Sequence, residues 1–156
     1  IKSRGLGDVY KRQGRFLFIK ETSGRLPLIK AKLDAVRGSN LRFYNANAET
    51  LLESLRLGAD GFCGVSANFV PELWVWLCRH AHDEPKTADR LQAFLKNCEQ
   101  VFTVCYPASA KHFLAMRGLE IGPTCRSQTR GAETPDFNRL EELLEQSDAW
   151  RRELGV

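Results

Sequence analysis

The chain has 156 residues, of which 43% are hydrophobic, 27% charged and 10% aromatic, with 12 glycines and 6 prolines. This composition is that of one globular domain and excludes a disordered or collagen-like chain. The longest apolar runs, residues 16–19 and 73–78, are much shorter than the roughly 18 to 20 residues that a membrane-spanning helix needs, so we expect no membrane association.

The net charge of +4 is concentrated at the start of the chain. Residues 1–13 contain four basic residues and one acidic residue, and the remaining 143 residues carry only +1. Arg151 and Arg152 stand among several glutamates of one predicted helix, where we expect a solvated face with local charge pairs. A nearly neutral body argues against a nucleic-acid partner.

Residues 1–13 are interpreted as a non-native segment. They lack the apolar region of a signal peptide and resemble translated sequencing-adapter sequence. We therefore expect the natural chain to start near Gly14 and to be cut within its gene.

Three strand–turn–helix units follow in chain order. The predicted strands are short apolar runs bounded by glycine or polar residues, at 14–20, 41–44 and 61–65. The predicted helices have apolar residues at helical spacing, over 27–37, over 49–57 and onward from Pro71. The first run is continuously apolar, which is typical of a strand buried on both faces of a sheet, and a polar turn follows it at 21–24. Three consecutive βα units predict a parallel sheet with helices on its outer face.

The rest of the chain is predicted to be helical. Helical spacing extends over 87–104, 108–117 and 137–154, and a loop rich in glycine, proline and threonine covers 118–135. We therefore expect residues 14–86 to contain the βα units and residues 87–156 to form a helical region.

The five cysteines give no sign of a metal site or of a disulfide framework. Their number is odd, there is no CxxC pair, and the three histidines do not form a ligand array with them. Cys63, Cys78 and Cys98 lie in apolar runs, where a free thiol behaves as a small hydrophobic group. We expect no metal, no cofactor and a reducing, cytoplasmic setting.

Lys20 is the candidate catalytic residue because it is the last residue of the first predicted strand. Active sites of α/β barrels lie at the carboxyl ends of the strands. A lysine that is partly desolvated there has a lowered pKa and can form a Schiff base with a carbonyl group. The alternative interpretation is a solvated lysine that merely ends the strand.

The other two predicted strands end in small polar residues. Residues 44–47 read YNAN and residues 64–68 read GVSAN, and their backbone amides and side chains suit a carboxylate or sugar hydroxyls. Each segment taken singly is equally explained as a turn. No GxGxxG or GxxxxGK loop for a phosphate is present.

Three segments in this order resemble the dihydrodipicolinate synthase and N-acetylneuraminate lyase family of class I aldolases. They are FIKETSG at 18–24, YNANAE at 44–49 and LGADGFCGVSAN at 57–68. The resemblance covers about residues 14–126 and includes Lys111 and Arg126. It implies a partial (β/α)8 TIM barrel, consisting of strands six to eight, followed by a C-terminal helical extension.

The resemblance also implies roles for individual residues. Lys20 corresponds to the lysine that forms a Schiff base with pyruvate or another 2-oxo acid, and Thr22 to a position that contacts substrate. A turn that recognises the distal end of the substrate would contain Ala46, Asn47 and Glu49. Cys63 corresponds to a residue whose main-chain carbonyl faces the bound keto acid, and Gly64 lies beside it.

Two departures from the family pattern bear on the substrate. The turn glycine is Ala46, and Ala48 stands at the acidic position that helps to bind sugar hydroxyls or the second substrate. Both argue against sialic acid and aspartate semialdehyde.

The family's proton-relay tyrosine and carboxylate-binding loop belong to strands that precede this chain, so we expect the fragment alone to be inactive. The family implies a dimer or tetramer of the full-length protein. Two other interpretations stay open: a catalytically inactive binding or regulatory subunit, and a hydratase-aldolase or keto-deoxy-sugar acid aldolase.

Overall fold

The computed structural model describes residues 14–126 and 135–156. The predictions for residues 1–13 and for residues 127–134 of the 118–135 loop lie outside the described residues. The described residues fall into two compact units. Unit 1 contains residues 14–64 together with Cys78–Ala88. Unit 2 contains Val65–Leu77 and the described residues from Asp89 to Val156.

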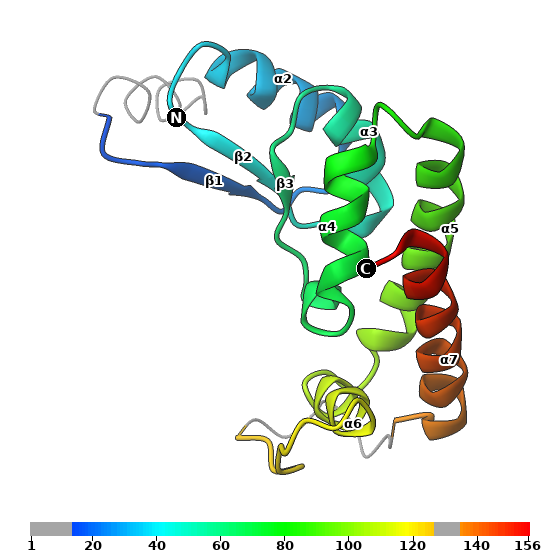
Figure 1. Cartoon of the computed structure of the whole chain (residues 1–156). Coiled ribbons are helices and arrows are strands. Elements are labelled where there is room, and N and C mark those ends of the chain that lie inside the picture. The colour runs from blue at the N-terminus through cyan, green and yellow to red at the C-terminus, as the bar shows by residue number, and fades with distance from the viewer. Residues whose placement is uncertain (1–13, 127–134) are drawn as a thin grey trace. The chain divides into compact units, whose positions relative to one another are not determined.

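Unit 1 is built on three parallel strands in the order β1-β2-β3 (Figure 1). The strands are β1 (Phe18–Glu21), β2 (Arg42–Asn45) and β3 (Gly61–Phe62). The register pairs Lys20 with Tyr44 and Tyr44 with Gly61, so these three positions share one face of the sheet. The predicted parallel sheet is confirmed.

Helical segments follow each strand, as predicted. They are α2 (Leu26–Val36) after β1, a 3-10 turn η1 (Ala48–Thr50) with α3 (Leu51–Arg56) after β2, and a 3-10 turn η2 (Val65–Asn68) with α4 (Pro71–His80) after β3. Proline opens α4 and lies in the first turn of α2, where a missing N–H is tolerated.

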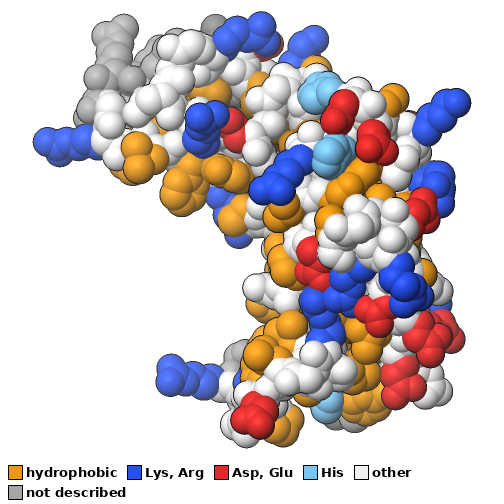
Figure 2. Space-filling view, in the orientation of Figure 1, with side chains coloured by type: hydrophobic (Ala, Val, Ile, Leu, Met, Phe, Trp, Pro, Cys, Tyr) orange, Lys and Arg blue, Asp and Glu red, His pale blue; other side chains and the backbone are white. Residues whose placement is uncertain are grey.

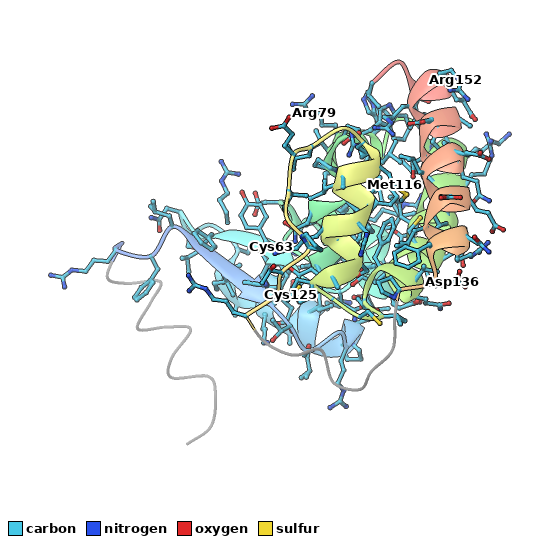
Figure 3. The ribbon with its side chains drawn as sticks, turned by 90° about the horizontal axis from the view of Figure 1, so that it is seen from below. Cys63, Arg79, Met116, Cys125, Asp136 and Arg152 are labelled. Atoms are coloured by element: carbon cyan, nitrogen blue, oxygen red, sulfur yellow. The ribbon has the colours of Figure 1, made fainter. Side chains whose placement is uncertain are left out.

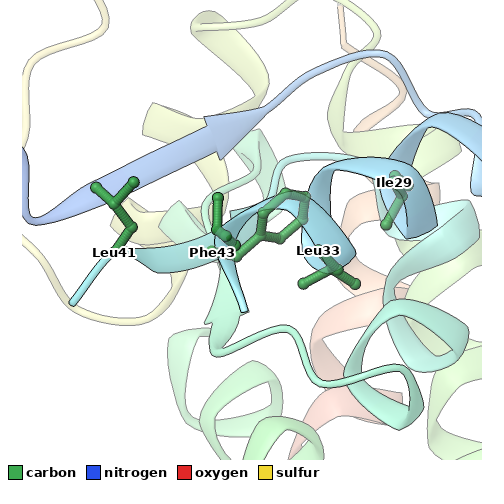
Figure 4. Close-up of a cluster of buried hydrophobic side chains, with 5 residues drawn as sticks. Ile29, Leu33, Leu41 and Phe43 are labelled. Carbon is green, nitrogen blue, oxygen red and sulfur yellow. The ribbon is translucent and has the colours of Figure 1, made fainter. Parts of the chain in front are cut away.

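The core of unit 1 lies between α2 and one face of the sheet (Figure 4). Its buried side chains are Ile29, Leu33, Val36, Leu41 and Phe43, with Ile19 and Ala59 packed against them. Burial of each large side chain of this cluster stabilises the unit by on the order of 1.5–3 kcal/mol. Leu28 of the same helix is exposed and lies on the solvent side of α2.

The expectation that the first strand is buried on both faces is wrong. Phe16, Leu17 and Phe18 are 47%, 67% and 60% exposed, and the strand begins only at Phe18. The physical reason is that β1 is an edge strand and that the described helices of unit 1 pack on the face of Ile19 and Phe43. Figure 2 shows hydrophobic side chains at the surface over the strands of this unit.

The third strand is shorter than predicted, with two residues in place of 61–65. Its partner β2 ends at Asn45, and one further backbone hydrogen bond follows, from the Cys63 N–H to the Asn45 carbonyl (2.8 Å). The chain then turns into η2, because no strand residues of β2 remain for it to pair with.

The secondary-structure elements of unit 2 in its described residues are helices, and the three predicted C-terminal helices are confirmed. They are α5 (Pro85–Phe102, whose first residues belong to unit 1), α6 (Ala108–Met116) and α7 (Phe137–Leu154). Three buried phenylalanines form the centre of its core: Phe69 stacks on Phe102 with centroids 3.8 Å apart, and Phe113 contacts both edge-on. No described helix is long and apolar enough to span a membrane.

Helix α7 is capped by a specific residue at each end. The Asp136 side chain accepts a hydrogen bond from the Arg139 N–H (3.0 Å), and Gly155 adopts the left-handed conformation after the last turn. Figure 3 shows Asp136 at the start of the helix and Arg152 near its end.

The prediction that Arg151 lies on a solvated face is wrong. Its side chain is only 17% exposed and donates to Glu72 on α4 (2.7 Å) as well as to Asp148. Arg117 on the segment after α6 also pairs with Glu72. The partner of Arg151 stands 79 residues away in sequence, which a charge pattern on one helix cannot reveal.

Candidate functional site

Lys20 lies at the carboxyl end of β1, on the face of the sheet opposite the α2 core. Its side chain is exposed, so the partial desolvation expected for it is not found in the described residues. Among residues 14–126 and 135–156, no hydrogen bond or ion pair holds its amine. The amine can therefore reach a ligand above the strand ends.

Glu21, the next residue, points to the opposite face and is buried. It is the last residue of β1, although the sequence places it in the turn. Its carboxylate accepts a hydrogen bond from the Ser23 N–H (2.6 Å) and forms an ion pair with Lys32 of α2. Burial raises the pKa of Glu21, but the hydrogen bonds from Lys32 and Ser23 outweigh it, and the net pKa lies below the ordinary value.

These contacts fix the turn that carries Thr22. Thr22 is exposed and lies between Glu21, whose carboxylate is buried, and Ser23, whose N–H donates to that carboxylate. The Ala46 N–H donates to the Glu21 carbonyl (2.8 Å), which ties this turn to the one after β2. Lys20, Thr22 and Ala46 are therefore held at one edge of the sheet.

A buried asparagine organises the turn after β2. Asn45 is fully buried, and its amide group donates to the hydroxyls of Thr50 and Ser54 (3.0 Å each). Its side-chain oxygen accepts from the Asn47 N–H (2.9 Å). All of these groups lie on the side of the sheet that the helices cover. The network therefore fixes the turn without occupying the opposite face, where Lys20 lies.

The side-chain oxygen of Asn47 accepts a structural hydrogen bond within its own turn. That oxygen accepts from the Thr50 N–H (3.2 Å) and caps η1. Its nitrogen lies against Gly24, where an added Cβ would stand 2.9 Å from Nδ2 and where φ is +64°. The two turns therefore meet at Gly24 and Asn47, and the amide nitrogen is the part of Asn47 that remains for a ligand.

The other residues of this turn differ in their solvent exposure. Ala46 is half-buried, Ala48 is buried, and Glu49 is exposed in the first turn of the following helix. Ala46 and Ala48 carry no polar side-chain atom, so the turn offers backbone groups and Glu49 rather than a buried carboxylate.

Cys63 and Gly64 follow β3 at the same edge of the sheet. Both are half-buried, and Cys63 is joined to β2 by the hydrogen bond to the Asn45 carbonyl. The ring of Phe62 lies over Gly64: a Cβ on Gly64 would stand 2.1 Å from the ring carbon Cζ. A side chain at position 64 would therefore force the Phe62 ring to move, independent of any ligand.

The predicted site residues thus lie at the carboxyl ends of three neighbouring parallel strands. Backbone hydrogen bonds link those ends directly: from Ala46 to Glu21 and from Cys63 to Asn45. In parallel α/β sheets this edge is where ligands bind.

A cavity of unit 1 lies at the other end of the sheet. Its volume is about 680 Å³, and the residues at the amino ends of β2 and β3 that line it include Leu41, Arg42 and Asp60. None of the predicted site residues borders it. Because the amino-terminal face of such sheets serves stability, we do not assign the site there.

The part of the chain that the structure describes offers no metal site, and two of its cysteines are unreactive. No group of three or more His, Cys, Asp or Glu residues there could hold a metal ion. Burial raises the pKa of the Cys78 thiol to about 11 and that of Cys98 to about 12, which keeps both protonated at neutral pH.

Sequence reasoning gave no individual role to three residues around the site: Glu21, Tyr44 and Asn45. Strand alternation gives a partial signal for Glu21, because a residue next to an outward-facing lysine must face the helices. Tyr44 is the register partner of Lys20, which follows only from strand pairing. For Asn45, nothing in the sequence distinguishes a buried network from an ordinary turn.

Comparison with known proteins places this architecture in a family. The model of the dihydrodipicolinate synthetase family matches residues 12–147. The chloride-inhibited dihydrodipicolinate synthase of Acinetobacter baumannii, solved with pyruvate, is 26% identical with a TM-score of 0.65, covering 96% of this chain and 50% of that one. N-acetylneuraminate lyase of Fusobacterium nucleatum, also solved with pyruvate, is 18% identical with a TM-score of 0.77, covering 94% and 49%.

The chain spans about half the length of the solved structures that it matches. No curated protein sequence matches it significantly. The family match covers most of the chain, including all three strands of the parallel sheet, and solved relatives share its fold. The chain therefore belongs to the dihydrodipicolinate synthetase family.

Proposed function

We propose that Lys20 forms a Schiff base with pyruvate or another 2-oxo acid and that the protein makes or breaks a carbon–carbon bond through this adduct. The observation that carries the proposal is the position of Lys20, in a chain of this family, at the carboxyl end of a parallel strand with its amine unpaired among the described residues. Two solved relatives were crystallised with pyruvate.

The proposed chemistry is imine catalysis. The neutral Lys20 amine attacks the keto carbon, and the resulting carbinolamine loses water to form the imine. The protonated imine then accepts the electron pair of the breaking carbon–carbon bond, or supplies the nucleophilic enamine after loss of a proton. The imine itself is the electron sink, so the reaction needs no metal or cofactor.

The surrounding residues are proposed to bind the substrate. Thr22 lies on the turn that follows Lys20, and the main-chain carbonyl of Cys63 would face the keto acid, with Gly64 beside it. Ala46, Asn47 and Glu49 would contact the distal end of the substrate. Their support is the common edge of the sheet on which they lie.

We further propose that residues 14–86 supply strands six to eight of a (β/α)8 barrel and that residues 87–156 form its helical extension. The parallel register and the half-length match to solved relatives support this assignment. The full-length protein would then be a homo-oligomer. None of the five cysteines forms a disulfide in the described residues, which supports a reducing, cytoplasmic compartment.

The test is reductive trapping of the full-length protein with pyruvate and borohydride, followed by peptide mapping. We expect one adduct, on Lys20, and its loss in Lys20→Gln. Lys30→Gln, which removes an exposed lysine from α2, should leave the adduct unchanged. An unmodified Lys20 peptide in the treated protein would overturn the proposal.

The two alternatives give different outcomes in the same system. An inactive binding or regulatory subunit would show no turnover with any aldehyde, and the buried, apolar Ala48 in the turn is the feature that favours it. A hydratase-aldolase or keto-deoxy-sugar acid aldolase would form the Lys20 adduct and differ only in the acceptor aldehyde that it uses.

A further inference from the structure

A buried ion pair lies on the opposite face of the sheet from Lys20, at the next residue of the strand. Glu21 follows Lys20 at the end of β1, and its side chain is 0% exposed. Its carboxylate forms an ion pair with Lys32 of α2 and accepts a hydrogen bond from the Ser23 N–H (2.6 Å). Successive residues of a strand point to opposite faces, so these contacts hold the neighbour of Lys20 on the helix side of the sheet.

Glu21 also ends the pairing of β1 with β2. Its backbone carbonyl accepts a hydrogen bond from the Ala46 N–H (2.8 Å), and its register partner Asn45 is the last residue of β2. The chain then turns, with Gly24 in the left-handed conformation at φ +64°. The backbone of Glu21 therefore ties the strand end to the sheet, and its side chain ties the same strand end to α2.

Lys32 can hold the strand end in place because the core fixes the position of α2. Ile29 and Leu33, on either side of Lys32 in the sequence, are 0% and 7% exposed and pack against the sheet (Figure 4). The Lys32 side chain is 49% exposed, so its ammonium group reaches the buried carboxylate of Glu21 from the surface. The ion pair thus couples the position of the helix to that of the strand end.

Loss of the cation would act on Lys20 through the backbone. A buried carboxylate without a cation is strongly unfavourable, and its side chain gains free energy by turning toward water. Side chains alternate between the two faces of a strand, so a rotation that moves Glu21 off the helix side also displaces Lys20. Attack on a carbonyl group is sensitive to a displacement of about 1 Å.

We propose that Glu21 and Lys32 are positioning residues for Lys20, and that their ion pair holds the strand end so that the Lys20 amine meets the keto carbon of the 2-oxo acid. This inference rests on the proposed function of Lys20 and adds two residues that touch neither the substrate nor the reacting atoms. Both side chains lie on the helix side of the sheet, so their loss should slow imine formation without weakening pyruvate binding.

The experiment measures adduct formation by the full-length protein over a range of pyruvate concentrations, with borohydride in excess so that imine formation limits the rate. Mass spectrometry follows the adduct and gives two values, the rate at saturating pyruvate and the half-saturating concentration. We expect Lys32→Met to lower the saturating rate by about tenfold or more and to leave the half-saturating concentration unchanged. Lys32→Arg, which restores the cation, should recover the rate.

Variants of Glu21 identify the uncompensated carboxylate as the cause. Glu21→Gln keeps an oxygen that can accept from the Ser23 N–H and needs no cation, so it should form the adduct at nearly the unmodified rate. The double variant of Glu21→Gln with Lys32→Met should be as fast as Glu21→Gln alone, because the two substitutions are coupled through the ion pair.

Two controls separate positioning from a general loss of stability. Lys30→Met removes an exposed lysine from the same helix and should leave both values unchanged. Leu33→Ala destabilises unit 1 through a cavity in its core but keeps the ion pair, and it should leave the rate of the folded protein unchanged. Circular dichroism verifies that each variant is folded at the assay temperature. Should Lys32→Met fail to fold, Lys32→Gln, which keeps a hydrogen-bond donor without the charge, takes its place and should also slow the reaction.

The outcomes distinguish this proposal from that for Lys20 itself. Three results would overturn the positioning role while the unmodified protein still forms the Lys20 adduct: an unchanged saturating rate in the folded Lys32 variant, an equal loss in Leu33→Ala, or a rise in the half-saturating concentration alone. Failure of the unmodified protein to form that adduct would overturn both proposals.

Discussion

The ion pair between Glu21 and Lys32 makes a quantitative prediction about the base of the proposed site. The side chain of Glu21 is 0% exposed, whereas that of Lys32 is 49% exposed. Lys32→Met therefore leaves a buried carboxylate with only the Ser23 N–H and no cation. We expect unit 1 to lose stability and the turn that carries Thr22 to loosen.

The magnitude follows from the unequal exposure of the two partners. Removing one member of a fully buried pair costs about 3–5 kcal/mol, because an uncompensated charge remains in the interior. Half of Lys32 is in water, which screens the interaction, so we expect a loss of about 2–3 kcal/mol at pH 7.

The loss should depend on pH. In the unmodified protein the folded-state pKa of Glu21 lies below its value of 4.5 in the unfolded chain, so the pair stabilises the fold above pH 4.5 and this contribution is lost as the pH falls through the folded-state pKa. Without Lys32, burial raises the pKa of Glu21 and protonation relieves the penalty as the pH falls. The difference between variant and unmodified protein should therefore shrink from pH 7 to pH 4.

Urea unfolding followed by circular dichroism measures the total effect, and hydrogen exchange of the Ala46 amide, bonded to the Glu21 carbonyl, measures it locally. All three tryptophans lie in unit 2, so their fluorescence serves as an internal control. The matched variant is Arg37→Met, which removes the pair with Asp34, 75% and 53% exposed, and should cost about 0.5 kcal/mol or less. Equal losses in the two variants, or a loss that does not change with pH, would refute the reasoning.

Three other variants or reactions test single features of the structure. Asn47→Ala should cost about 1 kcal/mol through loss of the cap on the Thr50 N–H, measured by urea unfolding, and Asn47→Asp should keep the cap. Gly64→Ala should cost about 1–3 kcal/mol by overlap with the Phe62 ring, and the double variant with Phe62→Ala should recover part of that loss in the same assay. Cys98 should resist alkylation at pH 8 in the folded protein, because burial raises the pKa of its thiol to about 12, and should react once urea unfolds the chain; labelling in the folded state would contradict this.

The order of elements was predictable because its signals are local. The apolar run before Lys20, the proline at the start of α4 and the glycine after α3 each report on a few neighbouring residues. The same local signals place Lys20 at a strand end. They do not report how much of that strand other elements cover. This explains why the expectation that the first strand is buried on both faces was wrong.

Residues that act at a distance were not predictable. Glu21 meets Lys32 only because α2 packs back on β1, and Arg151 meets Glu72 only because two helices far apart in sequence pack together. A charge pattern along one segment gives each of these residues several possible partners. Packing decides among them.

The sequence by itself determined the succession of βα units, the candidate nucleophile Lys20 and, through three motifs in fixed order, the family, because hydrophobic period and turn chemistry are properties of short segments. Only the tertiary structure decided that Lys20 faces away from the helices, that Phe18 and Tyr44 meet beside it, and that Glu21 is buried on the other side. Strand register and helix packing determine these relations, and both depend on contacts between residues far apart in the chain.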